Sequence, residues 1–404
     1  MTLSPSPTIS ARTAGVRGSA IRDLLTLTAR PDVISLAGGL PAADLLPRER
    51  IAAAAARALT DPAAVQYGET AGLARLREVV AAHETERGTG GARGPVLPGD
   101  VVVTSGSQQA LDLLARAVLD PGDAVVVEDP GYVGALQVFQ AAGAVVVPVG
   151  LDADGMRVDE LADLLAGGLR PRLVHTVSSF HNPRGVTLAA ERRRALAELA
   201  DRHGFLVVED DPYGLLAFDG ATPAPVAAHG ERVVRLGSAS KVLAPALRVG
   251  WLVGPGEVTA AVELLRQGAD LCGSTLTQSI AADLLGDRDW FAGHLATLRR
   301  EGAARAAAFT TAVAELLPDA VGSDPTGGMF CWLEFPEGTD TTAALPRALD
   351  AGVGFVPGSA FAVGTPLPAA ARCCFASHPP EVLHEAVRRL ATALAVPSGR
   401  GRST

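Results

Sequence analysis

Short runs of apolar residues recur through the first two thirds of the chain and alternate with longer amphipathic segments. The runs are apolar at nearly every position and rich in valine, which is typical of strands covered on both faces of a sheet. The segments between them, such as QQALDLLARAVL and AERRRALAELADRHG, predict helices. Strands that alternate with helices predict an α/β fold with a mainly parallel, seven-stranded sheet. The seven runs begin at Val101, Ala124, Ala144, Leu173, Phe205, Arg232 and Gly250.

The pattern changes after about Trp290. A long helix rich in Ala, Arg and Leu is predicted to about Leu317, followed by short apolar segments and a final helix ending near Ala395, which together indicate a smaller α+β domain. Residues 1–30 lack strand periodicity and predict an arm with a short helix around residues 21–27. We therefore expect an arm with part of the small domain (1–47), a large domain (48–290), a C-terminal small domain (291–396) and a tail (397–404).

Composition narrows the class of protein. The chain has 404 residues, 48% of them hydrophobic, so it can bury a large core. A net charge of -9 and the lack of a Lys/Arg-rich run argue against a nucleic-acid partner. No stretch approaches the ~18 apolar residues of a membrane span, and no signal-peptide pattern is seen, which predicts a cytoplasmic location. The four cysteines lack the spacing of metal ligands, so we expect reduced thiols and no metal.

The basic residues are distributed very unevenly between the two types. Of 35 Lys and Arg residues, only Lys241 is lysine. A guanidinium stays protonated, whereas a desolvated ammonium can lose its proton and become a nucleophile able to form a Schiff base. A sequence biased toward arginine could also leave one lysine anywhere, so the count alone leaves both interpretations open.

Polar clusters follow several predicted strands, where ligands sit in open α/β sheets. In TSGSQQAL, Ser107 and Gln108 open a helix, although a simple helix cap would also explain a serine there. In LGSASKVLAPALRVGW, Ser238 and Arg248 flank Lys241 and would form a phosphate clamp around a reactive amine.

Two further clusters carry an acid and an amide. In VVEDDPYG, a run of acids at the end of an apolar strand would be costly unless each is paired. A carboxylate there could pair with a protonated pyridine nitrogen, and Tyr213 could bond to the hydroxyl of the same ring. In SSFHNPRG, Asn182 ends another strand, and an ordinary Asn-Pro turn is the alternative interpretation. The three tyrosines, Tyr67, Tyr132 and Tyr213, all lie in such loops.

The ordered combination of NPxG, DxxY and SxSK with a downstream RxGW resembles fold-type I enzymes that use pyridoxal 5'-phosphate (PLP), specifically class I/II aminotransferases. Within them it is most similar to the branch of 2-aminoadipate aminotransferases and the cofactor domain of GntR/MocR-type regulators. The resemblance covers nearly the whole chain. It implies a PLP enzyme that takes an amino acid and a 2-oxo acid and works as a homodimer with shared active sites.

The resemblance also implies residue roles. Lys241 would form the Schiff base, Asp210 would partner the pyridine nitrogen, and Tyr213 with Asn182 would contact the ring hydroxyl. The remaining implied ligands are Ser107, Gln108, Ser238 and Arg248 at the phosphate, Tyr132 stacked on the ring, Tyr67 at the phosphate of the neighbouring subunit, Arg372 at the substrate carboxylate near Gly39 and Asn182, and Arg22 at the substrate side chain. An arginine without a ligand at the surface is the alternative for both Arg372 and Arg22.

This sequence departs from the usual pattern beside the expected cofactor. Arg184 stands where relatives have Thr, His181 where Gln is frequent, and Leu215 where Glu follows DDPYG. Ser178 and Ser179 replace a Pro-Asn pair. Three functions are therefore weighed: a transaminase, a PLP enzyme of another reaction class (β-eliminating C–S lyase, decarboxylating or oxidising), and a ligand-sensing regulator. The regulator would need a basic winged-helix module before residue 20, for which we expect no room.

Overall fold

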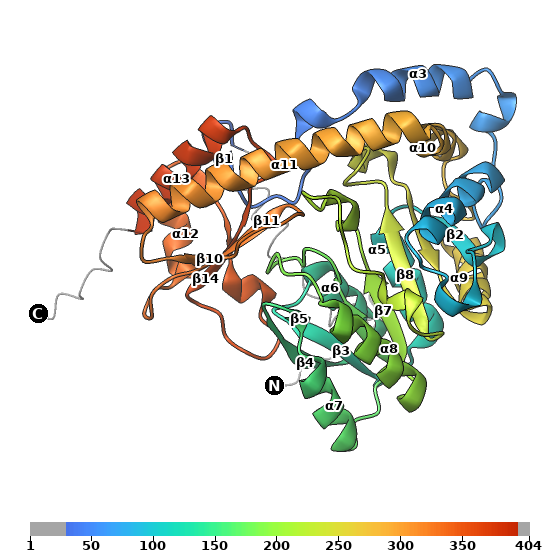
Figure 1. Cartoon of the computed structure of the whole chain (residues 1–404), viewed down its shortest axis with the longest axis horizontal. Coiled ribbons are helices and arrows are strands. Elements are labelled where there is room, and N and C mark those ends of the chain that lie inside the picture. Colours follow the sequence, from blue (N-terminus) through green and yellow to red (C-terminus); the bar gives the residue numbers. More distant parts are fainter. Residues whose placement is uncertain (1–29, 395–404) are drawn as a thin grey trace, which may run out of the picture.

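The computed structural model describes residues 30–394, which form a large α/β part and a smaller α+β part (Figure 1). The helix expected around residues 21–27 and the tail at 397–404 lie outside the described residues. The large part is built on an eight-stranded sheet in the order β2-β9-β8-β7-β6-β3-β4-β5. Its strands are β2 (Val101–Thr104), β3 (Ala124–Asp129), β4 (Val145–Asp152), β5 (Gly155–Met156), β6 (Leu173–Thr176), β7 (Leu206–Asp210), β8 (Val233–Ser238) and β9 (Gly250–Val253).

All seven predicted strands are present, and the pairing is mainly parallel. Strands β4, β3, β6, β7 and β8 pair in parallel, whereas β9 is antiparallel to both β8 and β2. The eighth strand, β5, is a two-residue antiparallel edge strand beside β4, so the expected count of seven was one too low. Two residues are too few to produce an apolar run, and the sequence pattern gave no sign of this strand.

Helices cover both faces of the sheet, which explains why its strands are apolar at successive positions. On β3, Val125 and Val127 pack into the core shared with α5 and α6, whereas Val126 packs into the core shared with α7 and α8. Side chains alternate between the two faces of a strand, so a doubly covered strand needs apolar residues throughout. The helices of this part are α3 (Arg48–Ala58), α4 (Ala74–Glu86), α5 (Ser107–Val118), α6 (Val133–Ala142), α7 (Val158–Ala166), α8 (Ala190–His203), α9 (Gly256–Ala269) and α10 (Thr275–Gly286).

The smaller part contains a four-stranded antiparallel sheet in the order β10-β11-β14-β13. The predicted long helix is α11 (Arg288–Leu316), which runs along both parts in Figure 1 and packs with α12 and α13 against the small sheet. Strand β1 (Ile34–Ser35) pairs in parallel with β12 (Val353–Gly354), so a segment near the start of the chain joins this C-terminal part. The other elements are β10 (Val321–Gly322), β11 (Phe330–Glu334), β13 (Val356–Pro357), β14 (Ala370–Cys374), α12 (Thr341–Asp350) and α13 (Pro380–Leu394).

The parallel strands place their carboxyl ends at one edge of the large sheet, and β7 and β8 end there in Asp210 and Ser238. This edge is where open α/β sheets bind ligands. Within residues 30–394, no helix combines the length and the apolar character needed to cross a membrane.

Candidate active site

A cleft of about 430 Å³ lies at this edge and brings together residues that are far apart in the sequence. Eleven of the thirteen residues predicted to form the site line it: Gly39, Ser107, Gln108, Tyr132, Asn182, Asp210, Tyr213, Ser238, Lys241, Arg248 and Arg372. Tyr67 does not line the cleft of its own chain and is 79% exposed. Arg22 lies outside the described residues.

Lys241 lies in the turn that follows β8, partly buried in the cleft. Its Nζ donates a hydrogen bond of 2.7 Å to the carbonyl oxygen of Gly39. Burial lowers the pKa of the Lys241 amine from its ordinary value; Cys374 acts in the opposite direction, and the positive charges of Arg372 and Arg248 add to the lowering. The neutral, nucleophilic form of the only lysine of the chain is therefore more populated than it would be in an exposed lysine.

The start of helix α5 forms an anion-binding corner of the cleft. The helix begins at Ser107 after Gly106, which has a φ of 91° and makes no side-chain cap. This positive φ would strain any other residue, and a Cβ on Gly106 would also lie 2.7 Å from an Nη atom of Arg248 and displace that guanidinium. The Arg248 guanidinium donates to the carbonyl oxygen of Ser105 at 2.7 Å. Free helical N–H groups beside a guanidinium suit a phosphate.

Asp210 ends β7 with its carboxylate in the cleft, and it is only 4% exposed. Its Oδ1 is buried without a hydrogen-bond partner among the described residues, and its Oδ2 lies 3.8 Å from Nε2 of His175. A buried carboxylate oxygen without a donor is costly. The arrangement thus fits a ligand that brings a positively charged N–H group, such as a protonated pyridine.

Two tyrosines complete the polar wall near Asp210. Burial raises the pKa of both Tyr132 and Tyr213 above the ordinary range, so both remain phenols at neutral pH. The Tyr132 hydroxyl donates to Oε1 of Gln108 at 3.1 Å, and the Gln108 amide donates to the carbonyl oxygen of Gly134 at 2.9 Å. Tyr132 and Tyr213 both line the cleft, where their hydroxyl groups and ring faces can contact an aromatic ligand.

Arg372 is a buried arginine on β14, 3% exposed, which excludes the alternative of a free surface charge. Its two Nη atoms donate to Oδ1 of Asn182 at 2.8 Å and to the carbonyl oxygen of Ala37 at 2.5 Å. The guanidinium lies over the rings of Phe330 and Phe361, 4.4 and 5.1 Å from their centroids. No carboxylate of residues 30–394 pairs with it, and its Nε is buried without a partner. A buried guanidinium without a counter-ion is suited to a ligand carboxylate.

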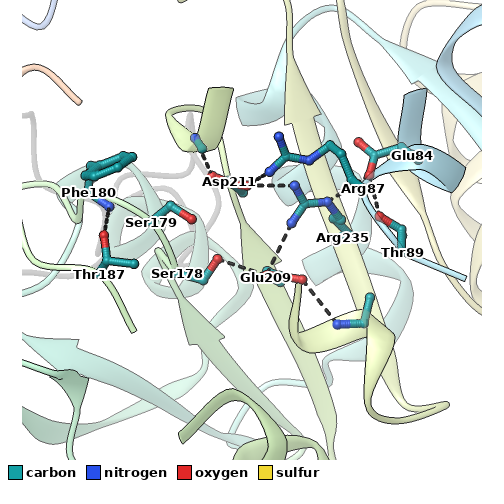
Figure 2. A network of polar contacts seen from close by, with 12 residues as sticks. Glu84, Arg87, Thr89, Ser178, Ser179, Phe180, Thr187, Glu209, Asp211 and Arg235 are labelled. Carbon is teal, nitrogen blue, oxygen red and sulfur yellow. Dashed lines mark hydrogen bonds and ion pairs between the residues drawn. The ribbon is translucent and has the colours of Figure 1, made fainter. Parts of the chain in front are cut away.

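Glu209 and Asp211, the acids on either side of Asp210, do not line the cleft and belong to a buried ionic network (Figure 2). Glu209 lies 3.2 Å from both Arg193 and Arg235, and Asp211 accepts from Arg235 at 2.6 Å and from Arg87 at 2.7 Å. Although burial opposes it, these guanidiniums hold the pKa of Asp211 well below its usual range. The expectation that a buried run of acids must be paired is met by Glu209 and Asp211, and Asp210 alone is left for a ligand.

The residues that depart from the family pattern do not line the cleft. Arg184 forms an ion pair with Glu334 and lies 5.9 Å over the Trp332 ring. His181 lies 3.0 Å from the buried Glu128, and Leu215 packs against the apolar core. Ser178 donates to Glu209 at 2.9 Å. These side chains therefore form ion pairs, hydrogen bonds or apolar contacts outside the cleft.

Other residues of the site were not found from the sequence. Phe330 lies beneath Arg372 and also packs edge-on against Tyr213, 5.8 Å between centroids. It ends the segment PTGGMF, from which no role in the site was predicted. His175 is an ordinary strand residue in the sequence pattern. Ser240 is the one that a motif, SASK, could have signalled. Further lining residues are Gly106, Val133, Gly134, Gln137, Val177 and Pro212. Among the described residues, no group of three His, Cys, Asp or Glu side chains could hold a metal.

Comparison with known proteins agrees with this geometry. The model of the family "Aminotransferase class I and II" matches residues 31–390. The chain is 39% identical to aromatic-amino-acid aminotransferase 1 of Thermococcus litoralis, over 95% of this chain and 93% of that protein. It is 38% identical to 2-aminoadipate transaminase of Thermus thermophilus, over 94% of each chain.

A solved structure extends the comparison to three dimensions. The α-aminoadipate aminotransferase of Thermus thermophilus, in complex with N-(5'-phosphopyridoxyl)-L-leucine, superimposes with a TM-score of 0.89 at 35% identity, over 97% of this chain and 98% of that chain. The fold-type I architecture predicted from the sequence is thereby confirmed. The chain belongs to the class I and II aminotransferases.

Proposed function

We propose that this chain is a PLP-dependent aminotransferase that moves the α-amino group of an amino acid to a 2-oxo acid. One observation carries the proposal: a single cleft holds the only lysine, a buried acid and a buried arginine. Within residues 30–394, one oxygen of the acid has no partner and the arginine has no counter-ion. These groups match, in turn, the aldehyde and ring nitrogen of PLP and the carboxylate of an amino acid. The phosphopyridoxyl ligand of the structural relative supports the same cofactor here.

The residues of the cleft fit the parts of PLP. Lys241 would hold the cofactor covalently, Asp210 would pair with the ring nitrogen, and Tyr213 and Asn182 would contact the ring hydroxyl. The α5 N-terminus would receive the phosphate, together with the side chains of Ser107, Gln108, Ser238 and Arg248, while Tyr132 would stack on the ring. Bound there, PLP supplies an electron sink for negative charge at the substrate Cα.

The chain's own groups perform the proton transfers and the orientation. Asp210, as a carboxylate, would keep the ring nitrogen protonated. Once the substrate amine has taken its place, Lys241 would have a free Nζ. The lowered pKa increases the neutral fraction of this amine, which would accept the proton from the substrate Cα as a general base. Arg372 would bind the α-carboxylate with the N–H groups that Asn182 and Ala37 do not use, which fixes the direction of the Cα–H bond.

The relatives' names cover aromatic amino acids and 2-aminoadipate, and we include both among the substrates proposed for this chain. Arg22 would read the substrate side chain. We propose a homodimer in which Tyr67 reaches the phosphate in the partner's cleft; its exposure outside its own cleft supports such a role. We also propose that the chain is divided into an arm, a large domain (48–290) and a small domain (291–396). Its proposed location is cytoplasmic.

The test is an absorbance titration of the purified protein with 2-aminoadipate, glutamate, branched-chain and aromatic amino acids, followed by 2-oxoglutarate. A transaminase loses the cofactor's visible band with one of the amino acids and regains it with the oxo acid. A visible band that none of these amino acids changes would exclude transamination of these substrates. Release of thiol, pyruvate or carbon dioxide would instead favour the second reaction class.

A further inference from the structure

The most heavily bonded arginine near the cleft, Arg193, lies outside it. It belongs to α8 and is 1% exposed. Its Nε donates to the carbonyl oxygen of Leu188 at 2.8 Å, and one Nη donates to the carbonyl oxygen of Ser178 at 2.6 Å and to Oγ of Ser179 at 3.1 Å. The other Nη donates to Oε1 of Glu209 at 3.2 Å. One rigid, planar guanidinium therefore ties three segments together.

The segment that Arg193 holds leads directly to a residue of the cleft. Residues 178–182 continue to Asn182, whose Oδ1 accepts from Arg372. Between them, Phe180 has a φ of 48°, an uncommon conformation for a residue other than glycine, and its N–H donates to Oγ1 of Thr187 at 3.1 Å. Such a backbone conformation is unfavourable on its own and persists where surrounding contacts impose it. The contacts of Ser178 and Ser179 with Arg193 provide that support.

Glu209 is the second anchor of the same segment (Figure 2). It accepts from Oγ of Ser178 at 2.9 Å and from the N–H of Val226 at 3.0 Å, and it immediately precedes Asp210. Ser178 and Ser179 supply the polar groups for both anchors, because the Ser178 hydroxyl bonds to Glu209 and the Ser179 hydroxyl accepts from Arg193. Ser178 and Ser179 are thus the residues through which Arg193 and Glu209 hold the loop.

We propose that Arg193 is a positioning residue for substrate recognition. By holding residues 178–182 against Glu209, it fixes Asn182 where Asn182 orients Arg372, and so sets the affinity for the substrate carboxylate. The inference rests on the proposed function, because it assigns a role within the same site. A purely structural Arg193 would lower stability without changing carboxylate recognition.

The test compares two variants and a control in the holoenzyme. Arg193→Lys keeps a positive charge opposite Glu209 but removes the planar guanidinium. The double variant Ser178→Ala/Ser179→Ala removes both hydroxyl groups and leaves the charges of Arg193 and Glu209 unchanged. Arg194→Lys, an exposed neighbour on the same helix, is the control. For each we would measure kcat and KM with phenylalanine or the donor found in the titration, and with the matching amine that lacks the carboxylate.

We expect Arg193→Lys to raise KM for the amino acid about tenfold, the value of one well-placed hydrogen bond, with a smaller change in kcat. The double serine variant should raise KM about threefold, while kcat/KM for the amine and all values of the control stay unchanged. If Arg193→Lys does not fold, the serine variant carries the test alone. An active variant with unchanged KM, or an equal loss for the amine, overturns the role of Arg193. Absence of transamination in the wild-type enzyme would instead overturn the proposed function.

Discussion

Replacing Arg372 by lysine should reduce recognition of the substrate carboxylate far more than it reduces the chemistry itself. The arginine donates through separate Nη atoms to Asn182 and Ala37 and keeps further N–H groups, including Nε, for a ligand. A lysine has three donors at one point, so it cannot make these two contacts and also grip a carboxylate bidentately. Hydrogen bonds to charged groups contribute roughly 1.5–3 kcal/mol each.

Loss of the bidentate grip would therefore cost about 3 kcal/mol, or roughly a 100-fold decrease in kcat/KM. The assay compares phenylalanine with 2-phenylethylamine, which lacks only the carboxylate. The 100-fold loss should appear with the amino acid and be nearly absent with the amine. Arg184→Lys, whose ion pair with Glu334 lies outside the cleft, is the control and should leave both substrates unaffected. An equal loss for both substrates would refute the assignment of Arg372 to the carboxylate.

Three further changes test other parts of the site. Lys241→Ala should abolish the borohydride-reducible visible band of bound PLP, and a variant that keeps this band would contradict the covalent role of the lysine. In cofactor-free protein, Lys241→Met should be more stable than wild type at pH 7. The folded-state pKa of Lys241 lies below its ordinary 10.5, so the wild type gains stability as the pH rises from the folded-state pKa toward 10.5. The difference in unfolding free energy between Lys241→Met and wild type, measured by urea titration, should therefore shrink over that pH range. A difference that does not change with pH would contradict this reasoning. Glu209→Gln should destabilise the protein by about 3–5 kcal/mol, because buried arginines lose a partner, whereas Glu334→Gln, at a half-exposed pair, should cost at most about 1 kcal/mol in the same denaturation assay.

Much of the large domain could be predicted because its strands are short and buried on both faces, which leaves an unmistakable apolar run in the sequence. The places of Ser107, Asp210 and Lys241 in the cleft were equally predictable, because each ends or follows such a run in a distinct motif. The place of Phe330 in the cleft was not. Phe330 reaches Arg372 only through the packing of β11 beside β14, and no local pattern encodes that contact.

Long-range contacts also decide which of the three consecutive acids in VVEDDPYG lacks a partner, and the sequence does not show them. The sequence indicated that Glu209, Asp210 and Asp211 need partners, but not which of them would lack one. Side chains alternate along a strand, so the two outer acids face one side and Asp210 faces the other. The guanidiniums of Arg193, Arg235 and Arg87 come from other elements and neutralise only the outer pair. The choice of Asp210 therefore follows from the register of β7, combined with long-range contacts.

The use of arginine at the buried ionic positions and of lysine at position 241 has a physical basis in this fold. Arg193, Arg235 and Arg372 are each at most 3% exposed, and each meets several acceptors at fixed angles, which a planar guanidinium can do without losing its proton. A buried lysine in any of these positions would tend to lose its charge and leave a carboxylate or carbonyl unsatisfied. At Lys241 that tendency suits the proposed role, because the one hydrogen bond of its Nζ within residues 30–394 is to a carbonyl oxygen and a neutral amine is the nucleophilic form. Exchanging the two residue types should thus harm the protein in different ways: lysine in the network would weaken the fold, whereas arginine at 241 would remove the amine that we propose holds PLP.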